Sequence, residues 1–264
     1  MPAINPSRLQ VQIEELLIYF DQPEAFHRRL SDLFSFYANR TLHFGQSREQ
    51  APIAPRYHLP QPLIRQLHLA ISPHIEKKPK TALKCADELW EDPFFEIRQF
   101  SIYILGNVNP EDPGLILNRL ESWIEPELDQ ELKTELISTG TYTLQENFHS
   151  AWEGLIQSLL DHKDSKLINI GIQGLMDGLE RSRFGNFPLV FRLISPIIQN
   201  PHTANLEKLE NLIDTLIRQS PTETAFFLKQ TLSLSQSTET RRLIKNCLPL
   251  MPEKEAQELK ASLS

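Results

Sequence analysis

The sequence is poor in the features that mark disulfide-bonded, membrane-spanning and secreted proteins. Cys85 and Cys247 are its only cysteines in 264 residues and form no Cys-x-x-Cys pair, so neither a disulfide framework nor a structural zinc site is expected. No apolar run approaches the roughly 18 residues that span a bilayer. Arg8, Glu14 and Glu15 interrupt the first 20 residues, so no signal peptide is expected. These absences predict a cytoplasmic protein without membrane association.

Strand signals are also scarce, because few runs of alternating β-branched residues occur. The composition is nevertheless that of a folded chain. Hydrophobic residues make up 40% of it and charged residues 23%, which is enough apolar content to build a core. The length suits one large domain or two small ones, at roughly 100 to 200 residues per domain.

Helix-start signals recur at a nearly fixed interval. They fall at Asp92, Asp129, Asp164, Pro201 and Thr238, at intervals of 37, 35, 37 and 37 residues. Each is followed by a helical pattern, a break containing Pro or Gly, and a second helical pattern. Apolar stripes at helical spacing comprise Leu206, Leu209, Leu212, Ile213, Leu216 and Ile217, with Ile97, Ser101, Ile104 and Leu105 earlier. Such pairs bury their apolar faces by stacking, so we predict an all-α, right-handed superhelical solenoid of HEAT-like, armadillo-type helix pairs.

The N-terminal part is less regular than the repeats. Residues 1–62 are predicted to contain two helices, Leu9 to Tyr19 and Glu24 to Tyr37, followed by a Pro-rich loop from Asn39 to Pro62. The repeat array is expected to run as one continuous domain over residues 63–264. A loop of this length is either a mobile segment or a binding element, and the sequence does not give its conformation.

The segment from Leu89 to Phe100, LWEDPFFEIRQF, resembles HEAT repeats. More narrowly, it is similar to the HEAT-like repeats of bacterial DNA alkylation repair glycosylases, as is the segment from Tyr57 to Arg65, YHLPQPLIR, that precedes it. The narrower resemblance covers about residues 57–125, and the generic HEAT pattern about residues 60–264. It implies that Glu96 and Arg98 tie adjacent helices together.

The same resemblance implies a core position for Trp90 and a possible activity. Members of the repair family excise alkylated bases with a Trp and an Asp on a basic concave surface. Their catalytic segment places the Asp four residues after the Trp, whereas this chain offers Trp123 followed by Glu127, with Pro126 between them. Trp123 also falls at the end of a predicted helix. Trp123 and Glu127 are therefore the catalytic candidates of this interpretation, although the Trp/Asp pattern itself is not retained.

Charge distribution tests a nucleic-acid function independently. Residues 1–108 carry 12 basic and 12 acidic side chains, whereas residues 109–264 carry 15 and 22. Duplex binding needs several cations to neutralise phosphates. The possible nucleic-acid contacts are Arg65, Lys77, Lys78, Lys80 and Lys84, and the alternative is an exposed corner between helices. A possible acidic surface for a basic protein partner comprises Glu125, Glu127, Asp129 and Glu131; its alternative is a solvated rim.

The remaining residue patterns in the sequence favour structural roles over functional ones. The two Glu-x-x-His pairs, Glu24 with His27 and Glu146 with His149, lie several repeats apart, so no metal site is expected. Both cysteines fall among apolar residues at helical spacing and are predicted to lie in the core. Three glycines on one helical face, Gly171, Gly174 and Gly178, predict close helix packing or a ligand groove. No cofactor motif is present.

The sequence therefore favours a non-catalytic HEAT-repeat scaffold that binds a protein partner through its concave face and acidic rim. The alternative is a DNA-binding or alkylpurine-glycosylase-like repair protein, which would be the enzymatic interpretation of this chain. A HEAT protein of the lyase or chaperone kind, acting on a prosthetic group or client, is a third possibility. The partner and the oligomeric state are not given by the sequence.

Overall fold

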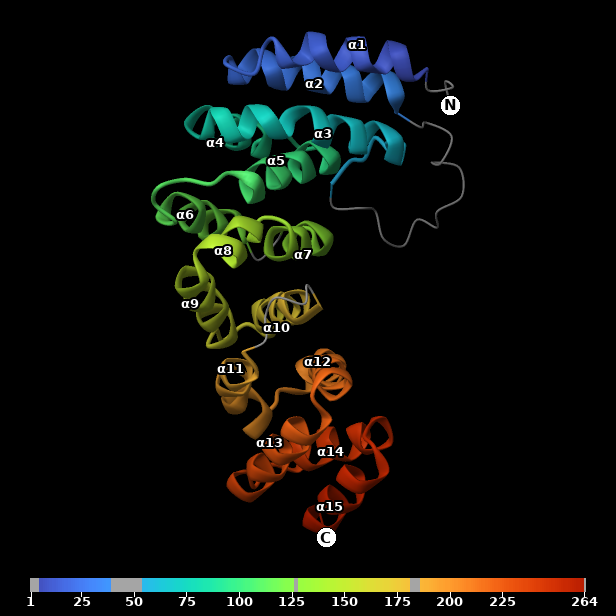
Figure 1. The fold of residues 1–264 in the computed structure, drawn as a ribbon, viewed down its shortest axis with the longest axis vertical. Helices are drawn as coiled ribbons and strands as arrows, with labels where there is room; N and C mark the ends of the chain where they lie inside the picture. The colour runs from blue at the N-terminus through green and yellow to red at the C-terminus, as the bar shows by residue number, and fades with distance from the viewer. Residues whose placement is uncertain (1–4, 39–53, 126–127, 181–185, 264) are drawn as a thin grey trace. The chain divides into compact units, whose positions relative to one another are not determined.

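The computed structural model describes residues 5–38, 54–125, 128–180 and 186–263, and these residues form α-helices, short 3-10 turns and loops without β-strands. The predicted all-α class is confirmed for these ranges (Figure 1). None of the helices in the described ranges combines the length and the apolar character needed to cross a bilayer.

The chain divides into two compact units, Met1–Ala151 and Trp152–Ser264. Unit 1 contains α1 Pro6–Leu17, α2 Pro23–Tyr37, α3 Gln61–Lys77, α4 Pro79–Trp90, α5 Phe95–Asn107, α6 Gly114–Trp123, α7 Gln130–Ser138 and α8 Tyr142–Asn147. Helix α9, His149–Leu160, begins at the end of unit 1. Unit 2 continues with α10 Ser165–Glu180, α11 Phe187–Gln199, η2 Thr203–Asn205, α12 Leu206–Gln219, α13 Pro221–Leu234, α14 Thr238–Cys247, η3 Leu248–Leu250 and α15 Glu253–Leu263. The domain boundary predicted near residue 62 stays a prediction.

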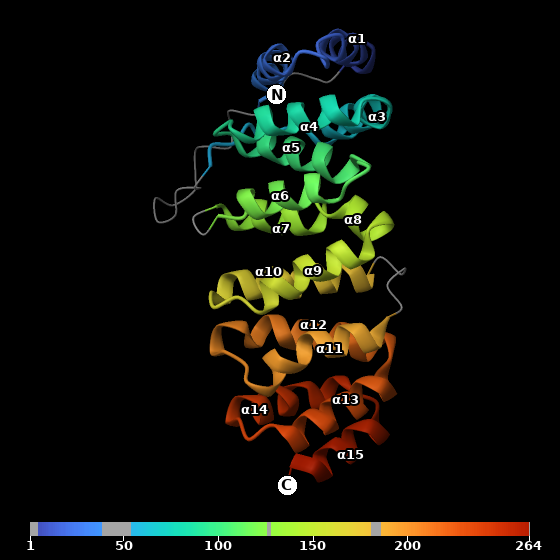
Figure 2. The ribbon, with the colours of Figure 1, turned by 90° about the vertical axis from the view of Figure 1, so that its left-hand side faces the viewer.

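Within unit 1 the helices stack in two layers. Helix α1 packs on α3, α3 on α5, and α5 on α7, while α2 packs on α4 beside them. The helices of consecutive pairs, α1 with α2, α3 with α4 and α4 with α5, also touch (Figure 2). The two N-terminal helices therefore belong to the same stack as the predicted repeats.

Unit 2 repeats this arrangement. Helices α10, α12 and α14 form one layer and α11, α13 and α15 the other, with α12 against α13. All six residues of the predicted stripe from Leu206 to Ile217 are buried, as are the four from Ile97 to Leu105 in unit 1. The apolar periodicity thus located the core of both units.

The predicted start signals lie at helix N-termini. Asp129 is the N-cap of α7, Thr238 is the first residue of α14, and the carboxylates of Asp92 and Asp164 accept backbone N–H groups ahead of α5 and at the start of α10. Pro201 precedes the 3-10 turn that leads into α12. The repeat signal therefore came largely from side chains that satisfy free N–H groups of a first turn.

Hydrogen bonds between neighbouring helices join residues one repeat apart. Gln99 bonds Glu135, and Thr143 bonds the carbonyl of Gly106, at separations of 36 and 37 residues. In unit 2, Lys208 bonds Gln173 and Ser235 bonds the Gln199 carbonyl, at separations of 35 and 36 residues. The repeat period thus appears in the polar contacts as well as in the apolar core.

The glycine face of α10 packs closely, as one of its two interpretations predicted. Gly171, Gly174 and Gly178 are all buried. A Cβ added at Gly171 would lie 2.9 Å from Cδ2 of Leu160 and 3.1 Å from Cβ of Leu159 on α9. Close packing against α9 therefore accounts for Gly171.

Candidate binding surfaces

The predicted cationic contacts lie on α3, on α4 and at the corner between them. Arg65, Lys77, Lys80 and Lys84 are exposed. Lys78 forms an ion pair with Asp21, which follows α1. The structure thus places four of the five cations at this corner or on α4, with Lys78 paired to Asp21, while Arg65 lies near the start of α3.

A cleft of about 460 Å³ lies where α2 meets α4. Lys84 and Arg28 line it together with Glu24 and Glu88. Two carboxylates beside two cations cancel the local charge that would attract a phosphate backbone. The cleft between α2 and α4 therefore has mixed charge and is not a continuous cationic track for phosphates.

The acidic residues are divided by the structure. Glu125 is exposed, and Glu127 lies outside the described residues. Asp129 is only 9% exposed, because its carboxylate caps α7 by accepting the backbone N–H of Glu131. Asp129 is therefore a structural cap, which corrects its assignment to a partner surface.

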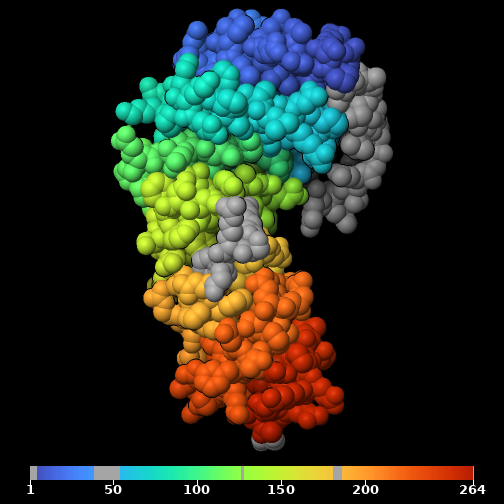
Figure 3. Space-filling view, in the orientation of Figure 1, coloured from blue at the N-terminus to red at the C-terminus, as the bar shows by residue number. Residues whose placement is uncertain are grey.

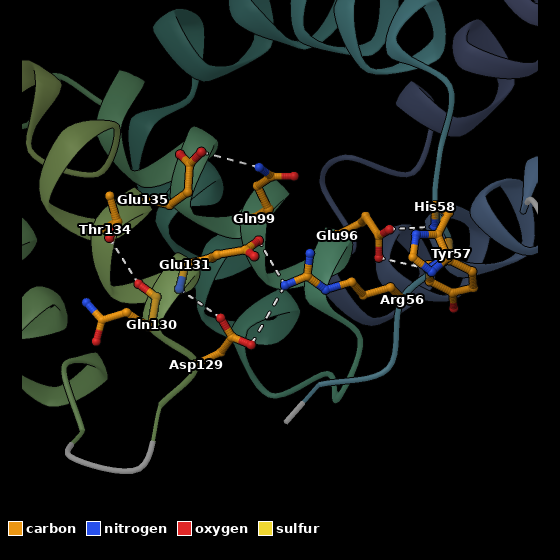
Figure 4. A network of polar contacts seen from close by, with 10 residues as sticks. All are labelled: Arg56, Tyr57, His58, Glu96, Gln99, Asp129, Gln130, Glu131, Thr134 and Glu135. Atoms are coloured by element: carbon orange, nitrogen blue, oxygen red, sulfur yellow. Dashed lines mark hydrogen bonds and ion pairs between the residues drawn. The ribbon is translucent and has the colours of Figure 1, made fainter. Parts of the chain in front are cut away.

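Glu131 is exposed but paired with Arg56 (Figure 4). Nη2 of Arg56 lies 2.9 Å from Oε2 of Glu131 and 3.8 Å from Oδ2 of Asp129. The guanidinium also stacks over the Phe95 ring, 3.9 Å from its centroid. Arg56 thus fastens the segment before α3 to α5 and α7, so these two carboxylates serve the fold.

Glu96 fastens the same segment from α5. Its carboxylate accepts the backbone N–H of Tyr57 at 2.9 Å and that of His58 at 2.7 Å (Figure 4). Arg98 donates from Nε to the carbonyl of Asp92 and lies over Trp90, 5.2 Å from a ring centroid. The expected helix-to-helix ties are therefore corrected. Glu96 holds a loop, and Arg98 holds the turn before its own helix.

The catalytic candidate Trp123 belongs to the core. It ends α6, as predicted, and is 6% exposed. Its ring stacks on Trp90 with centroids 4.5 Å apart and planes 8° from parallel. A side chain stacked in this way offers little surface to a flipped base, and its proposed companion Glu127 lies outside the described residues.

The two cysteines and the Glu-x-x-His pairs also lie in surroundings that give them structural roles. Cys85 and Cys247 are buried free thiols, as predicted, and burial raises the pKa of each to about 12, which keeps them protonated and unreactive. His27 faces Glu88 and Asp92, and the structure does not unite the two Glu-x-x-His pairs. In the described ranges no group of three or more His, Cys, Asp or Glu side chains is placed to hold a metal ion.

A polar and aromatic stripe on α3, α5 and α7 was missed by the sequence reasoning. We define it as His68, Gln99, Tyr103 and Glu135, all half-buried. The rings of His68 and Tyr103 stack with centroids 3.5 Å apart, and Nε2 of Gln99 donates to Glu135. His68 and Tyr103 are 35 residues apart, and Gln99 and Glu135 are 36 apart, so pairing positions by the repeat period could have found them.

Burial of His68 predicts a pH effect. Desolvation lowers its pKa from 6.5 to about 4, so the unfolded chain takes up the proton first as the pH falls. Stability is therefore fully present above pH 6.5 and is lost between about 6.5 and 4. His68→Phe keeps the stack on Tyr103 and removes this titration.

Allowing for partial solvent access, the stability lost between pH 7 and 4.5 should be roughly 1 to 2 kcal/mol smaller in His68→Phe. Urea unfolding of both proteins at the two pH values measures it. Equal losses in the two proteins would contradict the assignment.

No protein-family model, curated protein or solved structure matches this chain.

Proposed function

We propose that this protein is a non-catalytic scaffold of HEAT-like helix pairs, wound as a right-handed superhelix, that binds a protein partner with a basic surface. The stacked layers of each unit support the repeat architecture, because their hydrogen bonds recur at 35 to 37 residues. Stacked helices present long faces suited to another polypeptide. In this proposal the stripe on α3, α5 and α7 lines the concave face.

The observation that carries the proposal is a pair of exposed carboxylates at the end of α6. Glu121 and Glu125, at the end of α6 and just beyond it, are exposed, and no described cation lies within ion-pair distance of either. Of the five predicted cationic contacts, Lys78 pairs with Asp21 and Lys84 lines a cleft with Glu24 and Glu88, whereas Arg65, Lys77 and Lys80 are exposed. The surface available to a partner at this rim is therefore negative, which favours a cationic protein segment and disfavours nucleic acid.

Reversing the rim charges should remove the attraction. We expect Glu121→Lys with Glu125→Lys to weaken binding of a fluorescent Lys/Arg-rich helical peptide by about tenfold at low salt, measured by anisotropy. The wild-type affinity should fall as salt rises. A labelled DNA duplex should bind more weakly than the peptide.

A matched control carries the same charge change elsewhere. Glu180 and Glu258 are exposed residues of unit 2, and Glu180→Lys with Glu258→Lys alters the net charge equally. This control should bind the peptide like the wild type. Two results would contradict the assignment of Glu121 and Glu125 to the binding site. One is equal weakening in both double variants, and the other is tighter binding of the duplex than of the peptide.

A further inference from the structure

Helices α1 and α2 each have one face turned to the next helix pair and one turned away from it. On α1, Ile13 shares a cleft with α3, and residues 11, 15 and 18 lie on the opposite side of the helix. On α2, His27 reaches Glu88 on α4, and residues 29, 32 and 36 lie opposite. The outer faces of α1 and α2 therefore occupy the place where another helix pair would continue the stack.

This outer face is apolar enough to be a contact surface. Ile18 is 73% exposed, Val11 53% and Phe36 46%. Between α1 and α2 lies a groove of about 490 Å³ with the buried side chains of Leu16 and Leu33 in its lining. Exposed apolar side chains around a groove are typical of a contact surface.

Positively and negatively charged side chains line the same groove. Arg29 comes from α2, and its guanidinium lies over the Tyr19 ring, 5.2 Å from the centroid. Glu15 on α1 and Asp32 on α2 supply the carboxylates, and all three charged residues are exposed. A surface that holds both signs around an apolar centre can match a rotated copy of itself, as a two-fold interface requires.

We propose that a second copy of this chain docks on the outer face of α1 and α2, so that two chains associate through these helices. Ile18 and Phe36 of each chain enter the groove of the other, and Arg29 of each faces Glu15 or Asp32 across the two-fold axis. In Figure 3 the helices α1 and α2 form one end of unit 1, and no described segment covers their outer side. The interface thus continues the helix stacking of unit 1 into a second chain.

Sedimentation velocity of the full chain across roughly 1 to 100 μM tests this directly. The wild type should sediment as a dimer, and Ile18→Asp with Phe36→Asp should weaken association by at least about 100-fold. The matched control is Phe226→Asp with Leu234→Asp, two residues of α13 that are 71% and 63% exposed. The control should dimerise like the wild type.

Charge exchange separates lost docking from lost folding. Arg29→Glu should weaken self-association, and so should Glu15→Arg with Asp32→Arg, whereas a mixture of the two proteins should form a heterodimer. A monomeric wild type overturns the proposal. A dimer that survives Ile18→Asp with Phe36→Asp, or a mixture that stays monomeric, also overturns it.

Discussion

Replacing Gly106 by alanine is expected to destabilise unit 1 by about 3 kcal/mol or more, at or above the upper end of overpacking effects. Gly106 lies near the end of α5, where the C-terminal turn of α7 crosses it. A Cβ at this position would lie 1.9 Å from the carbonyl oxygen of Thr139 and 3.2 Å from Cα of Gly140. Both are backbone atoms, so relief requires a shift of α7 against α5.

The same substitution, Gly to Ala, should stabilise the protein where the helix has free space around the added Cβ. Gly106 has no positive φ, so its own backbone accepts alanine. Gly154 on α9 has no atom within 4 Å of an added Cβ, and Gly154→Ala should stabilise by up to about 1 kcal/mol through helix propensity. Urea unfolding followed by circular dichroism compares the two variants. Equal effects at Gly106 and Gly154 would show that the close approach of α7 does not limit position 106.

The contrast between these glycines shows where sequence reasoning ends. The stripe from Ile97 to Leu105 predicts which face of α5 is buried, because periodicity reports the side on which apolar residues lie. It does not report how near the next helix approaches. Position 106 accepts only glycine because the carbonyl oxygen of Thr139, 33 positions further along the chain, occupies the space of a Cβ. Only the packed structure supplies that distance.

The charged candidates show a second limit. The sequence places Lys80 and Lys84 on one face of a helix, because residues one helical turn apart share a face. Whether a cation is free depends on residues from other helices. Asp21 reaches Lys78 from 57 positions away, and Arg56 reaches Glu131 from the segment that precedes α3. Periodicity predicts neighbours one repeat apart, and neither of these two pairs has that separation.

The two loop amides held by Glu96 lead to the second large prediction. Glu96→Ala should cost about 3 to 5 kcal/mol, because two amides, of Tyr57 and His58, would lose their acceptor in a site where Glu96 itself is only 8% exposed. His58 has a φ of 55°, a left-handed conformation rare outside glycine, and the bond to Glu96 helps to hold it there. Amide hydrogen exchange at both residues and urea unfolding measure the effect.

A graded series makes this test specific to the carboxylate. Glu96→Gln keeps the side-chain length but presents one oxygen and one NH₂ group, so one of the two amides gains an opposing donor and the loss should be intermediate. Glu91→Ala, an exposed change just past α4, should alter stability by less than about 0.5 kcal/mol. Unchanged amide protection in Glu96→Ala would mean that Arg56, through Phe95 and Glu131, holds the segment by itself. Because Arg56 and Glu96 both hold the segment before α3, Arg56→Ala combined with Glu96→Ala should then cost more than the sum of the two single changes.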